Sequence, residues 1–137
     1  MEQVLIFVSS TRTADNLVEK LRKNGIKAMA IHGKKNQGAR QGSLDFFRQK
    51  EFKVLVATDL IGRGIHIDEL PVVINYELPR SPLDYVHRIG RTGRANHFGK
   101  AITILTDEDM HHFKIIQKKM GKRVEIKSTE DVNLHGF

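Results

Sequence analysis

The stretch VLIFV, residues 4 to 8, decides the fold. It is an unbroken run of aliphatic, β-branched and aromatic side chains, without the polar alternation of a strand that has one face in water. Such a run predicts a strand buried on both faces of a sheet. Helices must then cover both faces, which is the arrangement of an α/β protein with a parallel sheet.

The segment after this strand predicts a helix. Ala14, Leu17, Val18 and Leu21 recur at the spacing of one helix face, and Gly25 is a suitable stop. The same alternation of strand and helix continues along the chain. Further strands are predicted at AMAI (28–31), KVLVAT (53–58), PVVINY (71–76), KAITIL (100–105) and, at the end, RVEI (123–126).

Three more helices are predicted between and after these strands. The first runs from Gln37 to about Gln49, with Leu44 and Phe47 inward. Another begins at Ser81, whose side chain forms a capping box with Asp84. Its inward residues are expected to be Leu83, Val86 and Ile89. The last runs from Thr106 to Met120, its inward residues being Met110, Phe113, Ile116 and Met120, and Gly121 ends it.

The pattern therefore predicts a three-layer α/β/α sandwich around a mostly parallel sheet of five to six strands. We expect one domain over residues 1–127, and residues 128–137 to form a polar tail or linker. In such folds, ligands gather at the carboxyl ends of the strands. The segments SSTRT, HGKKNQ and TDLIGRG each follow a predicted strand, so we expect the site there.

Composition sets further bounds. The 137 residues include no cysteine, which excludes disulfides, thiolate catalysis and cysteine zinc sites and favours a reducing, cytoplasmic location. The histidines are scattered, and we expect no metal site. No apolar run is long enough for a membrane span, and the first residues do not resemble a signal peptide. The net charge of +7 suits a polyanion but does not identify one.

HRIGRTGR, residues 87 to 94, contains three arginines, one histidine and two glycines, and no acidic residue. Arginine stays charged and binds phosphate in bidentate fashion, and glycine lets another surface approach the backbone. If the helix continues, His87, Arg91 and Arg94 share one face. The segment predicts a clamp for a phosphate group or a transition state. The alternative is a solvated, charged helix face.

No GxxxxGK[ST] phosphate loop is present. The chain therefore offers arginines to a phosphate that something else holds, which is how an arginine finger works. In VLVATDLIGRG (54–64) a buried strand ends at Thr58 and Asp59, and Arg63 follows between glycines. This segment also suits phosphate oxygens, although an ordinary turn would look similar. TDED (106–109) predicts a capped first turn of a helix and not a magnesium site.

Four segments together resemble the C-terminal RecA-like lobe of the DEAD-box ATP-dependent RNA helicases, in the family's order and spacing. They are LIFVSS (5–10), IHGKKNQGAR (31–40) followed by Leu44 and Phe47, VLVATDLIGRGI (54–65) and YVHRIGRTGR (85–94). The resemblance covers residues 2 to about 126. It implies a RecA-like fold, ATP whose Mg²⁺ is held by a separate N-terminal lobe, and RNA and that lobe as partners of a monomeric domain.

The resemblance also implies roles for individual residues. Arg91 and Arg94 would reach the γ-phosphate of ATP, Arg91 as the finger. The implied nucleotide contacts are Gly64, His66, His87, Arg88, Arg91 and Arg94. The implied contacts to the RNA sugar-phosphate backbone are Ser10, Gly33, Gln37, Arg40 and Thr58. Asp59, Arg63 and His87 would couple the two lobes.

The sequence departs from the family at several of these positions. His66 stands where the family has an aspartate that holds the ATP ribose, and Gly62 replaces another small residue. Ser9 and Ser10 replace an Asn-Thr pair. Lys34 and Lys35 replace residues that are acidic and apolar in the family, which favours a polyanion.

The residues leave other functions open. A module that binds RNA or a partner protein and hydrolyses nothing is the main alternative to a helicase lobe, because half of an ATPase site is missing here. A DNA helicase lobe is a third possibility, which the full HRIGRTGR segment disfavours.

Overall fold

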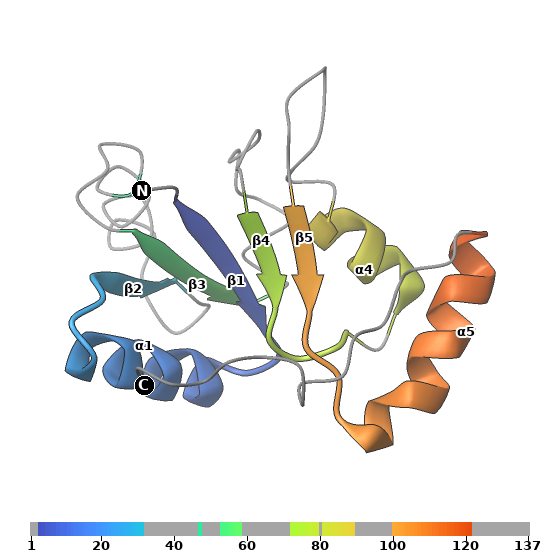
Figure 1. The fold of residues 1–137 in the computed structure, drawn as a ribbon, viewed down its shortest axis with the longest axis horizontal. Coiled ribbons are helices and arrows are strands. Elements are labelled where there is room, and N and C mark those ends of the chain that lie inside the picture. The colour runs from blue at the N-terminus through green and yellow to red at the C-terminus, as the bar shows by residue number, and fades with distance from the viewer. Residues whose placement is uncertain are drawn as a thin grey trace.

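The computed structural model describes residues 3–31, 47, 53–58, 72–79, 81–89 and 100–121. Within them lies one parallel sheet with the strand order β2-β3-β1-β4-β5 (Figure 1). The strands are β1 (Val4–Val8), β2 (Ala28–Ile31), β3 (Val54–Thr58), β4 (Val72–Asn75) and β5 (Lys100–Thr103). The last two are shorter than the predicted PVVINY and KAITIL.

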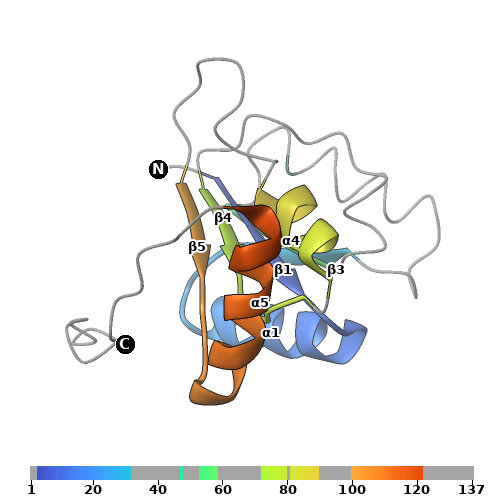
Figure 2. The same cartoon turned by 90° about the vertical axis from the view of Figure 1, so that its right-hand side faces the viewer.

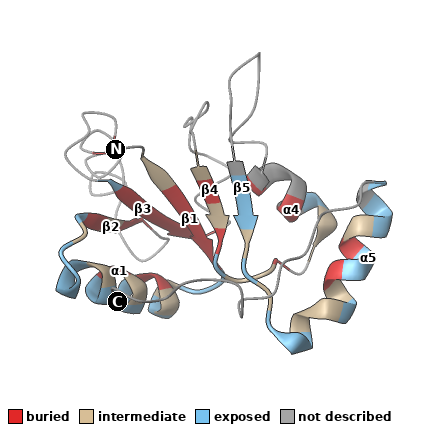
Figure 3. Cartoon of the chain, in the orientation of Figure 1, coloured by how far each residue is buried: buried red, intermediate tan, exposed pale blue. Residues whose placement is uncertain are grey.

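β1 lies at the centre of the sheet and is covered on both faces, as its sequence predicts. Leu5 and Phe7 belong to one buried cluster, together with residues of β2, β3 and β4. Ile6 and Val8 belong to a second cluster on the other face, together with α1 (Thr11–Lys23). Figure 3 shows the burial concentrated in β1 and β3.

Helix α1 packs on the face of Ile6 and Val8. Its buried residues are Ala14 and Val18, two of the four predicted positions, and the other two are partly buried against the same cluster. The helix ends before Gly25, which adopts φ of 78°, a left-handed conformation that glycine takes without strain.

α4 (Pro82–Ile89) and α5 (Met110–Met120) form a second helical group. They lie side by side near β5 (Figure 2), where the rings of Tyr85 and Phe113 meet edge to face with centroids 5.7 Å apart. Ile116 completes this small core. Arg88 of α4 lies over Phe7, so α4 and α1 cover opposite faces of the sheet. The predicted α/β sandwich with a RecA-like parallel sheet is thus confirmed.

The predicted inward face of α4 is wrong at Leu83, which is 62% exposed. The buried residues of this helix are Tyr85 and Arg88. The reason is that polar partners line this side of the sheet: the Tyr85 hydroxyl lies 3.2 Å from Thr103 Oγ1, and Arg88 bonds to Asn75. A helix face that meets such partners need not be its most apolar one.

The remaining helix predictions have mixed outcomes. Ser81 caps α4, since its Oγ accepts the Leu83 amide at 3.2 Å. The segment predicted as one helix from Thr106 begins as a short 3₁₀ turn, Asp107–Asp109, with a Thr106–Asp109 capping box, before α5. Phe47 is helical and buried as predicted. The rest of the helix predicted from Gln37, the strand predicted at RVEI and the tail predicted at 128–137 lie outside the described residues.

Candidate RNA and nucleotide interface

The carboxyl ends of the strands bring together residues from distant parts of the sequence. All five described strands are parallel, so they end at one edge of the sheet. In the register of β1 with β3, Val8 is opposite Thr58, and in that with β4, Phe7 is opposite Asn75. Two of the predicted RNA contacts, Ser10 and Thr58, therefore follow or end neighbouring strands.

Ser10 is the N-cap of α1. Its backbone is extended, with φ of −136° and ψ of 155°, and its Oγ accepts the Thr13 amide at 3.1 Å. The same hydroxyl group donates to Thr13 Oγ1 at 2.9 Å. Ser10 is exposed, and the first turn of α1 contains no acidic residue. An exposed helix N-terminus without acidic neighbours favours an anion such as a phosphate group.

Thr58 is the last residue of β3 and is 8% exposed. Its position at the strand end agrees with the predicted place of the site. The residues after it, including Asp59, lie outside the described part of the chain.

Arg88 is the most unusual side chain of the described region, because it is 1% exposed. Its guanidinium group donates to the backbone oxygen of Glu77 at 2.5 Å and to Asn75 Oδ1 at 3.4 Å. Its carbon atom lies 5.3 Å from the centre of the Phe7 ring, a cation–π distance. Part of HRIGRTGR is therefore built into the domain and is not a solvated face.

The Arg88 contacts belong to a longer polar network. The Asn75 amide group donates to Thr103 Oγ1 at 3.1 Å, and that oxygen also lies close to the Tyr85 hydroxyl. In this way α4 is fixed to the ends of β4 and β5. Buried polar groups that are satisfied in such a network define one arrangement of the elements around them.

Glu77 connects this network to β1. The amide group of Tyr76 donates to the Phe7 oxygen at 3.0 Å, which continues the pairing of β4 with β1 beyond the strand itself. The next residue, Glu77, accepts the Ser9 amide with its Oε1 at 3.1 Å. The segment that contains Ser10 and the segment that leads to α4 therefore touch each other.

Sequence reasoning missed Asn75 and Glu77. A signal was present: Asn75 is a polar residue at the end of the apolar run VVI, where a strand buried on both faces tolerates it only with partners. The pairing with Arg88 could not be predicted, because the two residues are joined only by the tertiary packing of α4.

Several predicted site residues lie outside the described region, and their roles stay predictions. They are Gly33, Gln37, Arg40, Asp59, Arg63, Gly64, His66, Arg91 and Arg94. For His87 the structure describes the backbone, which is helical, and not the side chain. Arg88 is placed, but its predicted nucleotide contact is untested.

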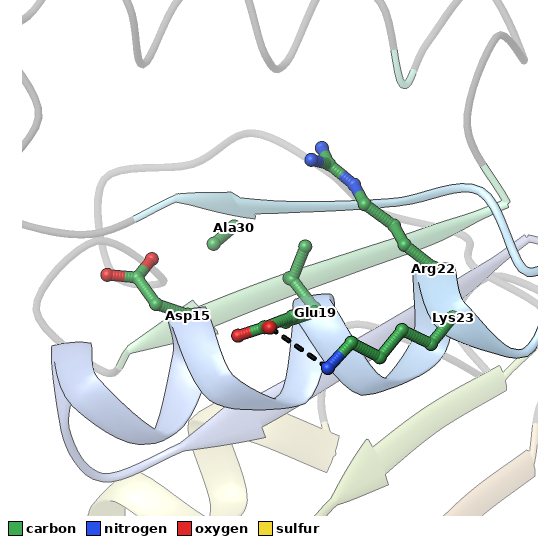
Figure 4. A pocket seen from close by; sticks show the side chains of 6 residues that line it. Asp15, Glu19, Arg22, Lys23 and Ala30 are labelled. Atoms are coloured by element: carbon green, nitrogen blue, oxygen red, sulfur yellow. Dashed lines mark ion pairs between the residues drawn. The ribbon is translucent and has the colours of Figure 1, made fainter.

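One surface pocket of about 460 Å³ lies apart from all predicted site residues. Its walls are Asp15, Val18, Glu19, Arg22 and Lys23 of α1 and Ala30 of β2 (Figure 4). Glu19 and Lys23 form an ion pair of 3.2 Å with both side chains well exposed, so we do not assign the site to this pocket. Among the described residues, no group of three or more histidines and acids could hold a metal ion, and no helix is long and apolar enough to cross a membrane.

Comparison with known proteins agrees with the geometry. The family model of the helicase conserved C-terminal domain matches residues 1–96. The protein named ATP-dependent RNA helicase dbp8 from Sclerotinia sclerotiorum is 41% identical over 133 residues, which are 97% of this chain and 25% of that protein. The chain thus spans about a quarter of the length of this curated relative.

Solved structures show the same fold. A DEAD box protein from the hyperthermophile Methanococcus jannaschii has a TM-score of 0.85 and 41% identity, covering 89% of this chain and 34% of that chain. Dbp5 of S. cerevisiae, solved with RNA and ADP BeF3, has a TM-score of 0.82 and 35% identity, covering 90% of this chain and 33% of that chain.

Proposed function

The chain belongs to the DEAD-box family, as a helicase conserved C-terminal domain, and from this we propose that it is the C-terminal lobe of an ATP-dependent RNA helicase. The observation that carries the proposal is HRIGRTGR at residues 87 to 94, whose Arg88 is anchored inside the domain. A buried anchor of this kind positions the residues that follow it, and these include two further arginines.

The proposed contribution to ATP hydrolysis comes from Arg91 and Arg94. Negative charge on the γ-phosphoryl group spreads over its oxygens in the transition state, and an arginine supplied from outside the phosphate-binding loop stabilises it. Arg91 acts as the finger. The remaining nucleotide contacts come from Gly64, His66, His87 and Arg88, and an N-terminal lobe holds Mg²⁺ and the phosphates.

The proposed contribution to RNA binding is one side of a track along the sugar-phosphate backbone. Ser10 offers the N-terminal end of α1, and Thr58 lies at the end of the neighbouring strand. Gly33, Gln37 and Arg40 extend this track. Contacts to the backbone position a nucleic acid without reading its sequence, so the lobe binds RNA of many sequences.

The proposed cycle joins the two contributions. The lobes close on ATP and RNA, one RNA strand bends, and a short duplex separates. Hydrolysis then reopens the lobes and releases the products. Binding of RNA to Dbp5 together with ADP BeF3 supports this order of events, since both ligands occupy that relative in one structure.

The test is a chimera in which this chain replaces the matching segment of dbp8, called the dbp8 chimera below. We expect ATP turnover that RNA stimulates at least tenfold, while the 137-residue chain alone, lacking a phosphate loop, turns over no ATP. If the dbp8 chimera folds and binds RNA but its turnover ignores RNA, the chain is a binding module instead. Stimulation by DNA and not by RNA would favour the DNA helicase alternative.

A further inference from the structure

Glu77 makes two contacts that join opposite sides of the proposed site. Its carboxylate Oε1 accepts the Ser9 amide at 3.1 Å, and its backbone oxygen accepts Arg88 at 2.5 Å. We propose that Glu77 is a positioning residue that couples RNA binding at the end of β1 to the HRIGRTGR segment. This inference rests on the proposed function of the lobe and deepens it.

The first half of the coupling is the link to RNA. Ser9 directly precedes Ser10, the N-cap of α1 and the predicted RNA contact. The Ser9 amide cannot move away from Glu77 without losing a hydrogen bond to a charged acceptor, which is stronger than a bond between neutral groups. A phosphate group bound at Ser10 therefore favours the arrangement in which Ser9 and Glu77 remain in contact.

The second half is the link to the nucleotide. The Glu77 oxygen holds the guanidinium group of Arg88, whose other partners are Asn75 Oδ1 and the Phe7 ring. Arg88 is the second-last residue of α4 and precedes Arg91 by three positions in the sequence. A shift of Glu77 is thus passed to the helix end from which the proposed finger extends.

The topology explains why this link lies where it does. β1 and β4 are neighbours, but β1 leads into α1 on one face of the sheet and β4 leads into α4 on the other. At such a switch point the connecting segments diverge, and a ligand can lie between them. Glu77 is the side chain that spans this divergence among the described residues.

Two ligands that are coupled change each other's affinity by the same factor. In the dbp8 chimera we would measure RNA affinity with and without ADP–beryllium fluoride, and nucleotide affinity with and without RNA. Glu77→Ala should reduce this shared factor by about fivefold, while RNA affinity without nucleotide changes by less than about twofold. Glu77→Gln should retain most of the factor, because its amide oxygen still accepts the Ser9 amide.

The matched control is Glu19→Ala, which removes a glutamate from an exposed ion pair and should leave the factor unchanged. An unchanged factor in Glu77→Ala would overturn the inference. A fall of both separate affinities together with the melting temperature would also overturn it, since that is the effect of a structural residue.

A second measurement separates this inference from the proposed function. In the 137-residue chain, single-stranded RNA should shift the NMR resonance of the Arg88 side-chain N–H groups. The shift should be less than half as large in Glu77→Ala. An equal shift in both proteins would contradict the coupling, whereas a dbp8 chimera without RNA-stimulated turnover would contradict the proposed function alone.

Discussion

The Arg88 guanidinium group and the Phe7 ring are stacked at 5.3 Å inside the domain. One arginine of HRIGRTGR therefore holds the segment to the central strand, while the arginines after it are left for the proposed phosphate contact. An arginine-rich segment in a nucleotide-binding domain can thus divide its residues between anchoring and catalysis.

Substitution of Arg88 should lower stability. Arg88→Ala removes the donor to Asn75 and to the Glu77 oxygen and leaves a space beside Phe7. We expect the free energy of unfolding to fall by about 2–4 kcal/mol. Arg88→Lys should lose roughly half as much, because a single ammonium group cannot reproduce the planar fork. Urea unfolding measures both, with the exposed Arg12→Ala as the control, expected within about 0.5 kcal/mol of the parent. Equal midpoints for Arg88→Ala and Arg12→Ala would place Arg88 in solvent.

Ser10 allows capping and RNA binding to be separated. Ser10→Ala should cost about 1 kcal/mol of stability, because the Thr13 amide loses its acceptor. Ser10→Asp should keep the stability, since aspartate caps as well as serine does. Its negative charge beside the bound phosphate should nevertheless weaken RNA binding at least threefold, roughly the effect of 0.7 kcal/mol of repulsion. The neutral cap Ser10→Asn is the control. RNA affinity that is equal in the Asp and Asn variants would show that no phosphate group lies at this helix end.

The orientation of α4 can be tested with neighbouring residues. Leu83→Lys should change the free energy of unfolding by no more than about 0.5 kcal/mol, since Leu83 is exposed. Tyr85→Phe should cost about 1 kcal/mol, because it removes the hydroxyl group beside Thr103 Oγ1. Thermal unfolding of the two variants gives the comparison. A Leu83→Lys variant that is the less stable of the pair would return Leu83 to the interior.

The 137-residue chain should bind single-stranded RNA weakly and with a small salt dependence. The predicted contacts at Ser10, Gln37, Arg40 and Thr58 allow only a few phosphate groups to be neutralised. The slope of log affinity against log salt should be about −2 to −3. Fluorescence titrations with RNAs of different sequence, at several salt concentrations, would measure it. A strong preference for one base sequence, or a slope near zero, would be incompatible with a backbone track.

The sheet could be predicted from the sequence because its strands are apolar on both faces. VLIFV shows this alone, and its burial from Leu5 to Val8 follows directly. The place of the site could also be predicted, because parallel strands bring their carboxyl ends to one edge. Ser10 and Thr58 lie at that edge.

The role of polar residues in the interior could not be predicted in the same way. In α4 the apolar Leu83 is exposed, while Tyr85 and Arg88 are buried. Periodicity ranks residues by hydropathy, whereas burial here depends on partners at the ends of β4 and β5. Those partners, Asn75 and Thr103, are supplied by the folded sheet and not by the local sequence.

The central claim is that this lobe supplies the finger of an RNA-stimulated ATPase, and the turnover number of Arg91→Ala in the dbp8 chimera tests it most directly. The finger stabilises charge that develops in the transition state. We therefore predict a fall in kcat of roughly 10³-fold or more, with a much smaller change in KM and a melting temperature within a few degrees of the parent. Arg91→Lys should recover little, Arg94→Ala should give a similar or smaller loss, and the exposed Lys118→Ala should give none. RNA-stimulated turnover within about threefold of the parent, or loss of the folded lobe in Arg91→Ala, would contradict the account.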